Sequence, residues 1–166
     1  MFLGLSTFTW IHTLLSIVAL VSGVVVVKAL FASRVPALWT EVYFASITAT
    51  CLTGFGFDFP FGPAHIVGII TLAFTAAALF ARYVLHLAGS WRWIYAVSLV
   101  LTAYFNFFVL VVQLFRKVPA LHALAPTESE PPFAVAQTVL LLVFAWLIYA
   151  STKKFRPSGA VASAGT

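Results

Sequence analysis

The chain has 166 residues, of which 63% are hydrophobic and only 8% are charged. Soluble domains carry charge on roughly a quarter of their residues, so this composition excludes a soluble fold and predicts an integral membrane protein. The net charge of +5 comes from basic residues scattered between apolar blocks, without the cluster or stripe that could follow a nucleic-acid backbone. We therefore interpret the charge as a membrane-topology signal and expect no nucleic-acid partner.

Five long apolar segments follow one another along the chain. Crossing about 30 Å of hydrocarbon takes about 20 mainly apolar residues, and continuous apolar runs favour helices over a barrel. Proline, glycine and charged residues separate the segments. The sequence predicts an all-α polytopic membrane helix bundle. Its single transmembrane domain covers 1–152, with spans at about 8–32, 38–57, 64–88, 91–115 and 133–151, and a flexible cytoplasmic tail follows at 153–166.

Basic residues near the span ends predict the orientation, because they are retained on the cytoplasmic side. With the N-terminus outside, only Arg116 and Lys117 of the nine basic residues fall outside. We therefore expect five transmembrane helices with the N-terminus out and the C-terminus in, in the cell inner (plasma) membrane. The seven basic residues on the cytoplasmic side are then Lys28, Arg34, Arg82, Arg92, Lys153, Lys154 and Arg156.

Small residues recur along one face of the first span, where Ser16, Ala19 and Gly23 follow His12 at helical spacing. Lipid tails are as apolar as leucine, so helices in a membrane associate where small residues let their backbones approach. The pattern predicts that the face ending at Gly23 packs closely against a neighbouring helix.

Polar side chains inside the spans fall into two groups by depth. An outer group could line one outward-facing pocket, joined by Asp58 from the adjacent loop. An inner group forms a charge cluster, in which Glu41 could pair with Arg82 or Arg34. The outer group consists of His12, His65, Asn106, Gln113 and Gln137, and the inner group of Glu41, Arg82, His86 and Arg92.

Two imidazoles on different helices can hold a haem iron axially, so His12 and His65 are candidate ligands of haem b. The same pair with Asp58 could instead bind zinc or copper. The alternative, which we favour, is that these histidines are interfacial or helix-capping residues within reach of water. Asn106 and Gln113 are likewise expected to join helices by hydrogen bonds more than to contact a ligand.

Several motifs resemble a known group of proteins. They are His12 followed by Gly23, the run Trp91-Arg92-Trp93-Ile94-Tyr95, and the stretch 104–113 followed by Lys117-Val118-Pro119-Ala120-Leu121. In these features the chain resembles small uncharacterised bacterial inner-membrane proteins, described as domains of unknown function. The resemblance covers most of the chain before the tail and implies no reaction. The chain lacks the extra His/Arg cluster that some members have before the second span, which counts against a two-haem site.

Features of catalysis are missing from the sequence. No serine or cysteine nucleophile stands near a histidine, no paired carboxylates occur within the spans, and there is no glycine-rich phosphate loop. We expect a non-catalytic helix bundle that binds a partner subunit, a second copy of itself or lipid. Two alternatives stay open: a redox protein that binds haem or quinone through His12 and His65, and a small-solute transporter, supported only by the polar stripe from Ser98 to Gln113.

Overall fold

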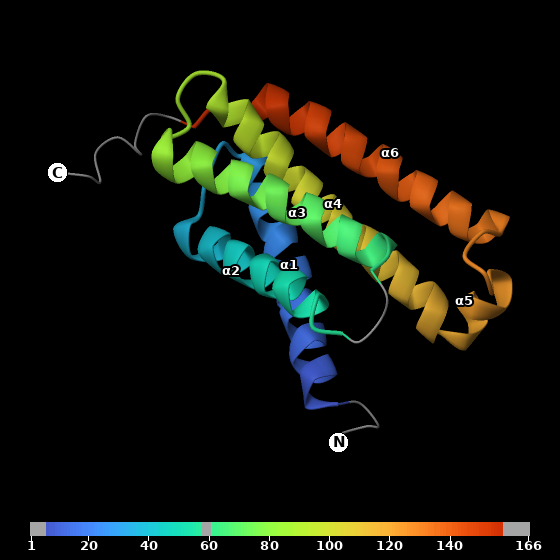
Figure 1. Cartoon of the computed structure of the whole chain (residues 1–166). Coiled ribbons are helices and arrows are strands. Elements are labelled where there is room, and N and C mark those ends of the chain that lie inside the picture. The colour runs from blue at the N-terminus through green and yellow to red at the C-terminus, as the bar shows by residue number, and fades with distance from the viewer. Residues whose placement is uncertain (1–5, 58–60, 158–166) are drawn as a thin grey trace.

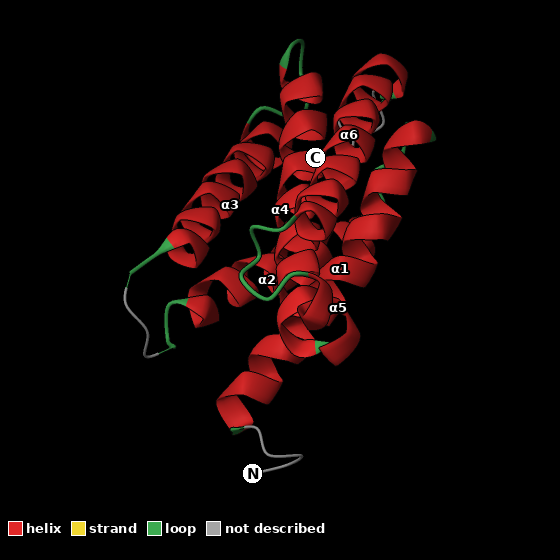
Figure 2. Cartoon of the chain, turned by 90° about the vertical axis from the view of Figure 1, so that its right-hand side faces the viewer, coloured by secondary structure: helices red, strands yellow, loops and turns green. Residues whose placement is uncertain are grey.

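Helices fill the described part of the structure, which covers residues 6–57 and 61–157. This computed structural model contains no strand within those two ranges, so the predicted all-α class is confirmed for them. The long helices run up and down beside one another (Figure 1), and Figure 2 shows the same bundle turned by 90°. In chain order the elements are α1 (Thr7–Phe31), α2 (Ala37–Gly54), α3 (Pro63–Leu79), the π-helix η1 (Phe80–Val84), α4 (Trp91–Lys117), α5 (Pro119–Leu124) and α6 (Pro131–Lys154).

Four helical segments of the described residues are long and apolar enough to cross a membrane. They are α1, the continuous helix of α3 and η1 (Pro63–Val84), α4 and α6. Helix α2 lies where the second span was predicted, but its 18 residues include Glu41, four threonines and one serine, and it is not one of the four. The structure therefore shows a helical bundle with four apolar candidate spans.

The third predicted span ends earlier than expected. It was predicted to run to Ala88, but the helix ends at Val84, after a π-helical turn in which the Leu85 N–H donates to the Phe80 carbonyl at 3.1 Å. His86 and Leu87 then have φ angles of 47° and 59°. A right-handed helix cannot continue through such left-handed residues, which explains the early end.

The last span continues further than predicted. Helix α6 reaches Lys154, and Phe155 beyond it is buried. The Ser33 hydroxyl, in the turn after α1, donates to the Lys154 carbonyl at 2.9 Å and accepts from the Arg156 N–H at 3.0 Å. The segment predicted as a flexible tail therefore begins as packed structure, and residues 158–166 lie outside the described part.

Helices α1 and α2 form an antiparallel hairpin and pack tightly at Gly23. A Cβ atom there would lie 3.0 Å from Cε2 of Tyr43, which is fully buried. The Thr102 hydroxyl donates its proton to the Leu99 carbonyl at 2.9 Å. The Tyr43 hydroxyl is therefore the donor in its 2.8 Å hydrogen bond to Thr102 Oγ1. The predicted close packing at Gly23 is confirmed, and the ring of Tyr43 joins α1, α2 and α4.

Helix α4 is the central element of the bundle and packs against α1, α3, α5 and α6. In its apolar stretch 44% of the residues are buried, whereas only 6% are buried in α6. Figure 1 shows α6 lying alongside α4 at the edge of the bundle. The core of the molecule therefore lies around α4, and α6 covers one side of it.

Candidate functional site

His12 lies on α1 and contacts the end of α2. Its Nδ1 is 2.9 Å from Thr53 Oγ1, and the Thr53 hydroxyl donates to the Ala49 carbonyl at 2.7 Å. Thr53 therefore accepts the hydrogen bond, and the proton of a neutral His12 ring is on Nδ1. The Nε2 atom then carries a lone pair, and the ring packs edge-on against Phe57 with centroids 5.0 Å apart.

His65 has the opposite arrangement. Its Nδ1 accepts a hydrogen bond from the Gly62 N–H at 3.1 Å, at the start of α3, so the proton of its neutral ring is on Nε2. The side chain is 7% exposed, and its ring lies 5.1 Å from the Phe61 ring and 5.6 Å from the Phe55 ring. His65 is thus a helix-capping residue that is sandwiched by aromatic side chains.

Each of the two rings therefore has its own set of neighbours. An axial haem pair requires a lone pair from both rings. His12 can offer Nε2, but the Nδ1 of His65 is occupied by Gly62 and its Nε2 carries the proton. The histidines do not fit an axial pair in this arrangement. No group of three or more metal-ligating side chains is found in the described ranges, and Asp58 lies outside them.

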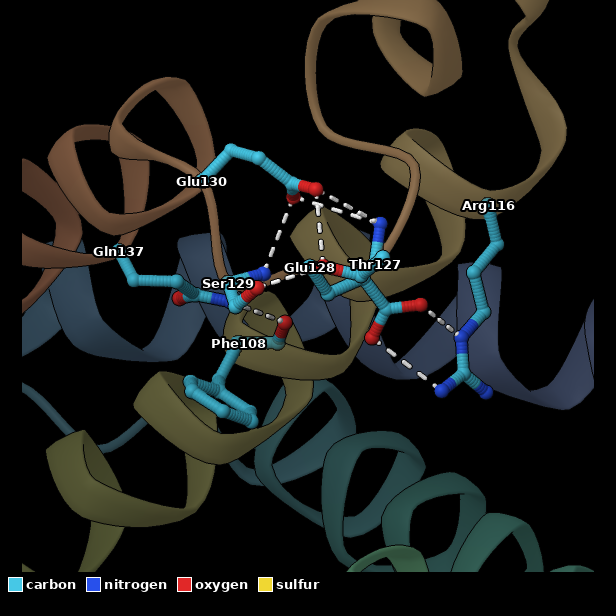
Figure 3. A network of polar contacts seen from close by, with 7 residues as sticks. All are labelled: Phe108, Arg116, Thr127, Glu128, Ser129, Glu130 and Gln137. Atoms are coloured by element: carbon cyan, nitrogen blue, oxygen red, sulfur yellow. Dashed lines mark hydrogen bonds and ion pairs between the residues drawn. The ribbon is translucent and has the colours of Figure 1, made fainter.

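The remaining residues of the predicted outer pocket differ in burial and in hydrogen-bond partners. Asn106 is 8% exposed within the core, and its Nδ2 has no hydrogen-bond partner among the described residues. Gln137 Nε2 donates to the Phe108 carbonyl at 3.3 Å, which joins α6 to α4 (Figure 3). Gln113 is exposed. The stripe from Ser98 to Gln113 is therefore buried at one end and open at the other.

Arg82 is the inner-group residue that reaches the core. It interacts with the hydroxyl of the buried Tyr95, which also interacts with Thr40. Its guanidinium carbon lies 5.0 Å from the centroid of the Tyr83 ring. The residue lies within the π-helix η1, a conformation that recurs at functional sites in proteins.

The other inner residues do not form the predicted charge cluster with Arg82. Glu41 and His86 are exposed, and Arg92 is half-buried. Glu41 forms no ion pair with any residue that the structure describes, so its expected pairing with Arg82 or Arg34 is not observed.

The loop between α4 and α6 has an ordered polar network (Figure 3). Arg116 binds Glu128 through two hydrogen bonds, one of them from Nη2 at 3.2 Å. Glu130 accepts hydrogen bonds from the hydroxyl and N–H of Thr127 and from the N–H of Ser129. Desolvation raises the pKa of Glu130, but these hydrogen bonds outweigh it and lower the pKa below its ordinary value. The network holds the start of α6 against the end of α4.

An apolar groove of about 430 Å³ is lined by side chains of α1, α4 and α6. The sequence did not predict it. Its only charged lining residue is Lys28, which the sequence identified only as a topology signal. The groove is assembled from side chains of three helices, so the pattern of no single helix reveals it. Among its lining residues are Val24, Val27, Phe31, Phe107, Phe144 and Leu147.

Comparison of the chain with protein-family models, with curated proteins and with solved structures finds no match. The resemblance to small inner-membrane proteins therefore depends on the sequence motifs alone. Any function has to be argued from the contacts, burial and charges of this chain.

Proposed function

We propose that the protein is a five-span integral protein of the inner (plasma) membrane whose helix bundle binds lipid or a membrane partner and does not catalyse a reaction. The observation that carries this proposal is the exposure of α6. Only 6% of its apolar stretch is buried, and Leu142 and Trp146 are more than 60% exposed. A helix so apolar and so exposed needs lipid, a partner helix or a second copy of the chain beside it.

Helix α2 is proposed as the fifth span because three of its polar side chains face protein. Thr40, Tyr43 and Ser46 are all buried in the bundle. At 1.5 Å per residue its 18 residues extend about 27 Å, close to the thickness of the hydrocarbon core. It lies beside α1 along most of that length, with Tyr43 against Gly23 and Thr53 against His12.

The proposed orientation has the N-terminus outside, since the turn after α1 and the end of α6 then bring basic residues to the cytoplasmic side. Ser33 links these two segments by hydrogen bonds to Lys154 and Arg156. Reporter fusions at Met1 and Thr166 test it: the two ends should report from opposite compartments. Reports from one compartment would mean an even number of crossings and would refute the five-span topology.

Native mass spectrometry of the protein released from a gentle detergent tests the binding proposal. We expect the spectrum to contain the chain with retained phospholipid, with a second copy or with a stoichiometric partner subunit. The matched control is the same protein after exhaustive washing in a harsh detergent, which should release the bound species. A bare monomer under both conditions would contradict the proposal.

A further inference from the structure

The groove between α1, α4 and α6 has apolar walls and positive charge at one end. Its walls are formed by Val24 and Val27 of α1, Phe107 of α4, and Phe144 and Leu147 of α6, and they offer almost no polar surface. Its volume of about 430 Å³ lies within the range of small-molecule sites, roughly 300 to 1,000 Å³. A site of this lining suits a flexible hydrocarbon chain.

Two lysines lie at the inner end of this groove, which contains Phe31. Lys28 lines the groove and precedes Phe31 by three residues, so the two share a face of α1. The ammonium of Lys154 lies 5.7 Å from the centroid of the Phe31 ring. Trp146 of α6 stacks on the same ring with centroids 6.2 Å apart. Positive charge from two helices is therefore placed at one end of an apolar groove.

We propose that this groove binds one acyl chain of an anionic phospholipid of the inner leaflet, whose phosphate contacts the ammonium groups of Lys28 and Lys154. The inference rests on the proposed function and names the chemical class of its ligand. An anionic amphiphile matches the groove because its hydrocarbon chain would lie against the apolar walls while its negative headgroup would lie beside the two lysines. A zwitterionic headgroup would bring its own cation towards the two lysines.

A lipid chain fits the groove better than a partner helix does. A helix with its side chains is about 10–12 Å across, and a stable protein interface buries about 800 Å² on each side. The Phe31–Trp146 stack joins α1 and α6 at the inner end of the groove, which leaves a short recess and not a continuous seam along both helices. The recess therefore accommodates a chain and not a third helix.

Native mass spectrometry of the delipidated full chain, titrated with dioleoylphosphatidylglycerol or dioleoylphosphatidylcholine, tests the headgroup. We expect the phosphatidylglycerol to bind roughly tenfold more tightly. The double variant Lys28→Gln/Lys154→Gln should lose that preference and still bind both lipids. The matched control is Arg34→Gln/Lys153→Gln, which removes the same charge from the same end of the bundle; the ammonium of Lys153 lies over Tyr149 instead. This control should keep at least half of the preference.

A groove-filling substitution tests the acyl chain. Val24→Trp places an indole in the groove and should weaken binding of both lipids at least tenfold. Val21→Trp is its control, because Val21 is similarly exposed on α1 and does not line the groove. Thermal unfolding of both variants in detergent identifies any loss that comes from misfolding, and a Val24→Trp protein that fails to fold is replaced by Val24→Phe.

Three results would overturn the inference: equal binding of the two lipids by the unmodified protein, an equal loss in both double variants, or unchanged binding by Val24→Trp. Equal lipid binding that Val24→Trp still abolishes would refute the anionic headgroup and leave the proposed lipid-binding function in place. A protein that retains only a partner subunit and no lipid would refute the inference, while the partner form of the proposed function would survive.

Discussion

In a soluble protein, helices bury apolar side chains and expose polar ones, and α2 and α6 each depart from that arrangement. α2 carries several of its polar side chains into the bundle, where Thr40, Tyr43 and Ser46 are buried. α6 presents apolar side chains outward, and Leu142 is 64% exposed. Where lipid is the solvent, apolar exposure costs little and polar groups need a partner inside. The contrast shows that burial, and not apolarity, identifies the packing face here.

The largest expected effect tests whether α6 faces lipid. Leu142→Arg should make the free energy of membrane insertion of α6 less favourable by about 3 kcal/mol, because a guanidinium near the middle of a span costs that much. Insertion is measured with a glycosylation reporter placed after α6. Leu142→Ile is the control and should insert normally. Normal insertion of the arginine variant would mean that this face lines water or protein.

The second-largest expected effect is the difference in stability lost when side chains of α2 and of α6 are truncated. Ile47→Ala in α2, where the side chain is 2% exposed, should destabilise the bundle by about 2 kcal/mol because it leaves a cavity. Leu142→Ala in α6 should cost less than about 0.5 kcal/mol, since lipid or detergent replaces the lost atoms. Unfolding of the two variants in detergent with added denaturant compares them. Equal losses would refute the contrast.

The hydrogen bond from Tyr43 to Thr102 has a smaller expected effect. Tyr43→Phe removes the donor and should destabilise the bundle by about 1 kcal/mol, since interhelical hydrogen bonds in membranes contribute about that much. A double-mutant cycle with Thr102→Val isolates the pair. A coupling energy indistinguishable from zero would show that packing against Gly23 alone holds the Tyr43 ring.

The smallest expected effect concerns the loop before α6. The pKa of Glu130 is lowered in the folded protein, so the carboxylate contributes stability above its unfolded value of 4.5, and that stability is lost as the pH falls through the folded pKa. Between pH 6 and pH 3 the thermal midpoint should therefore fall more for the unmodified protein than for Glu130→Gln. Parallel pH profiles would show that the hydrogen bonds of Glu130 do not hold this loop.

Much of the fold could be predicted, because long apolar runs and their proline and glycine breaks follow directly from the chemistry of the bilayer. The close approach at Gly23 was also predictable from small residues at helical spacing. The end of the third span was not, since η1 and the left-handed His86 and Leu87 give no signal in the apolar pattern. Side-chain roles were harder still. The capping bond of His65 depends on the backbone of Gly62, which spacing along a helix cannot show.

The polar stripe of α4 shows the same limit. Asn106 and Gln113 are seven residues apart, which returns a helix to nearly the same face, so the sequence placed them in one pocket. Asn106 is buried in the core and Gln113 is exposed, two turns nearer the end of a helix of 27 residues. Two residues on the same face of a helix, such as Asn106 and Gln113, therefore need not have the same surroundings. The groove was missed for the complementary reason, because its walls come from three helices.

The Ser33 hydroxyl, bonded to the backbone of Lys154 and Arg156, has a consequence for biogenesis. Ser33 has a φ of 52° in the turn after α1, and its partners lie at the end of α6 and just beyond it. These two hydrogen bonds can therefore form only after α6 has been synthesised. The turn after α1 cannot gain its full set of contacts while the helices between α1 and α6 are being made.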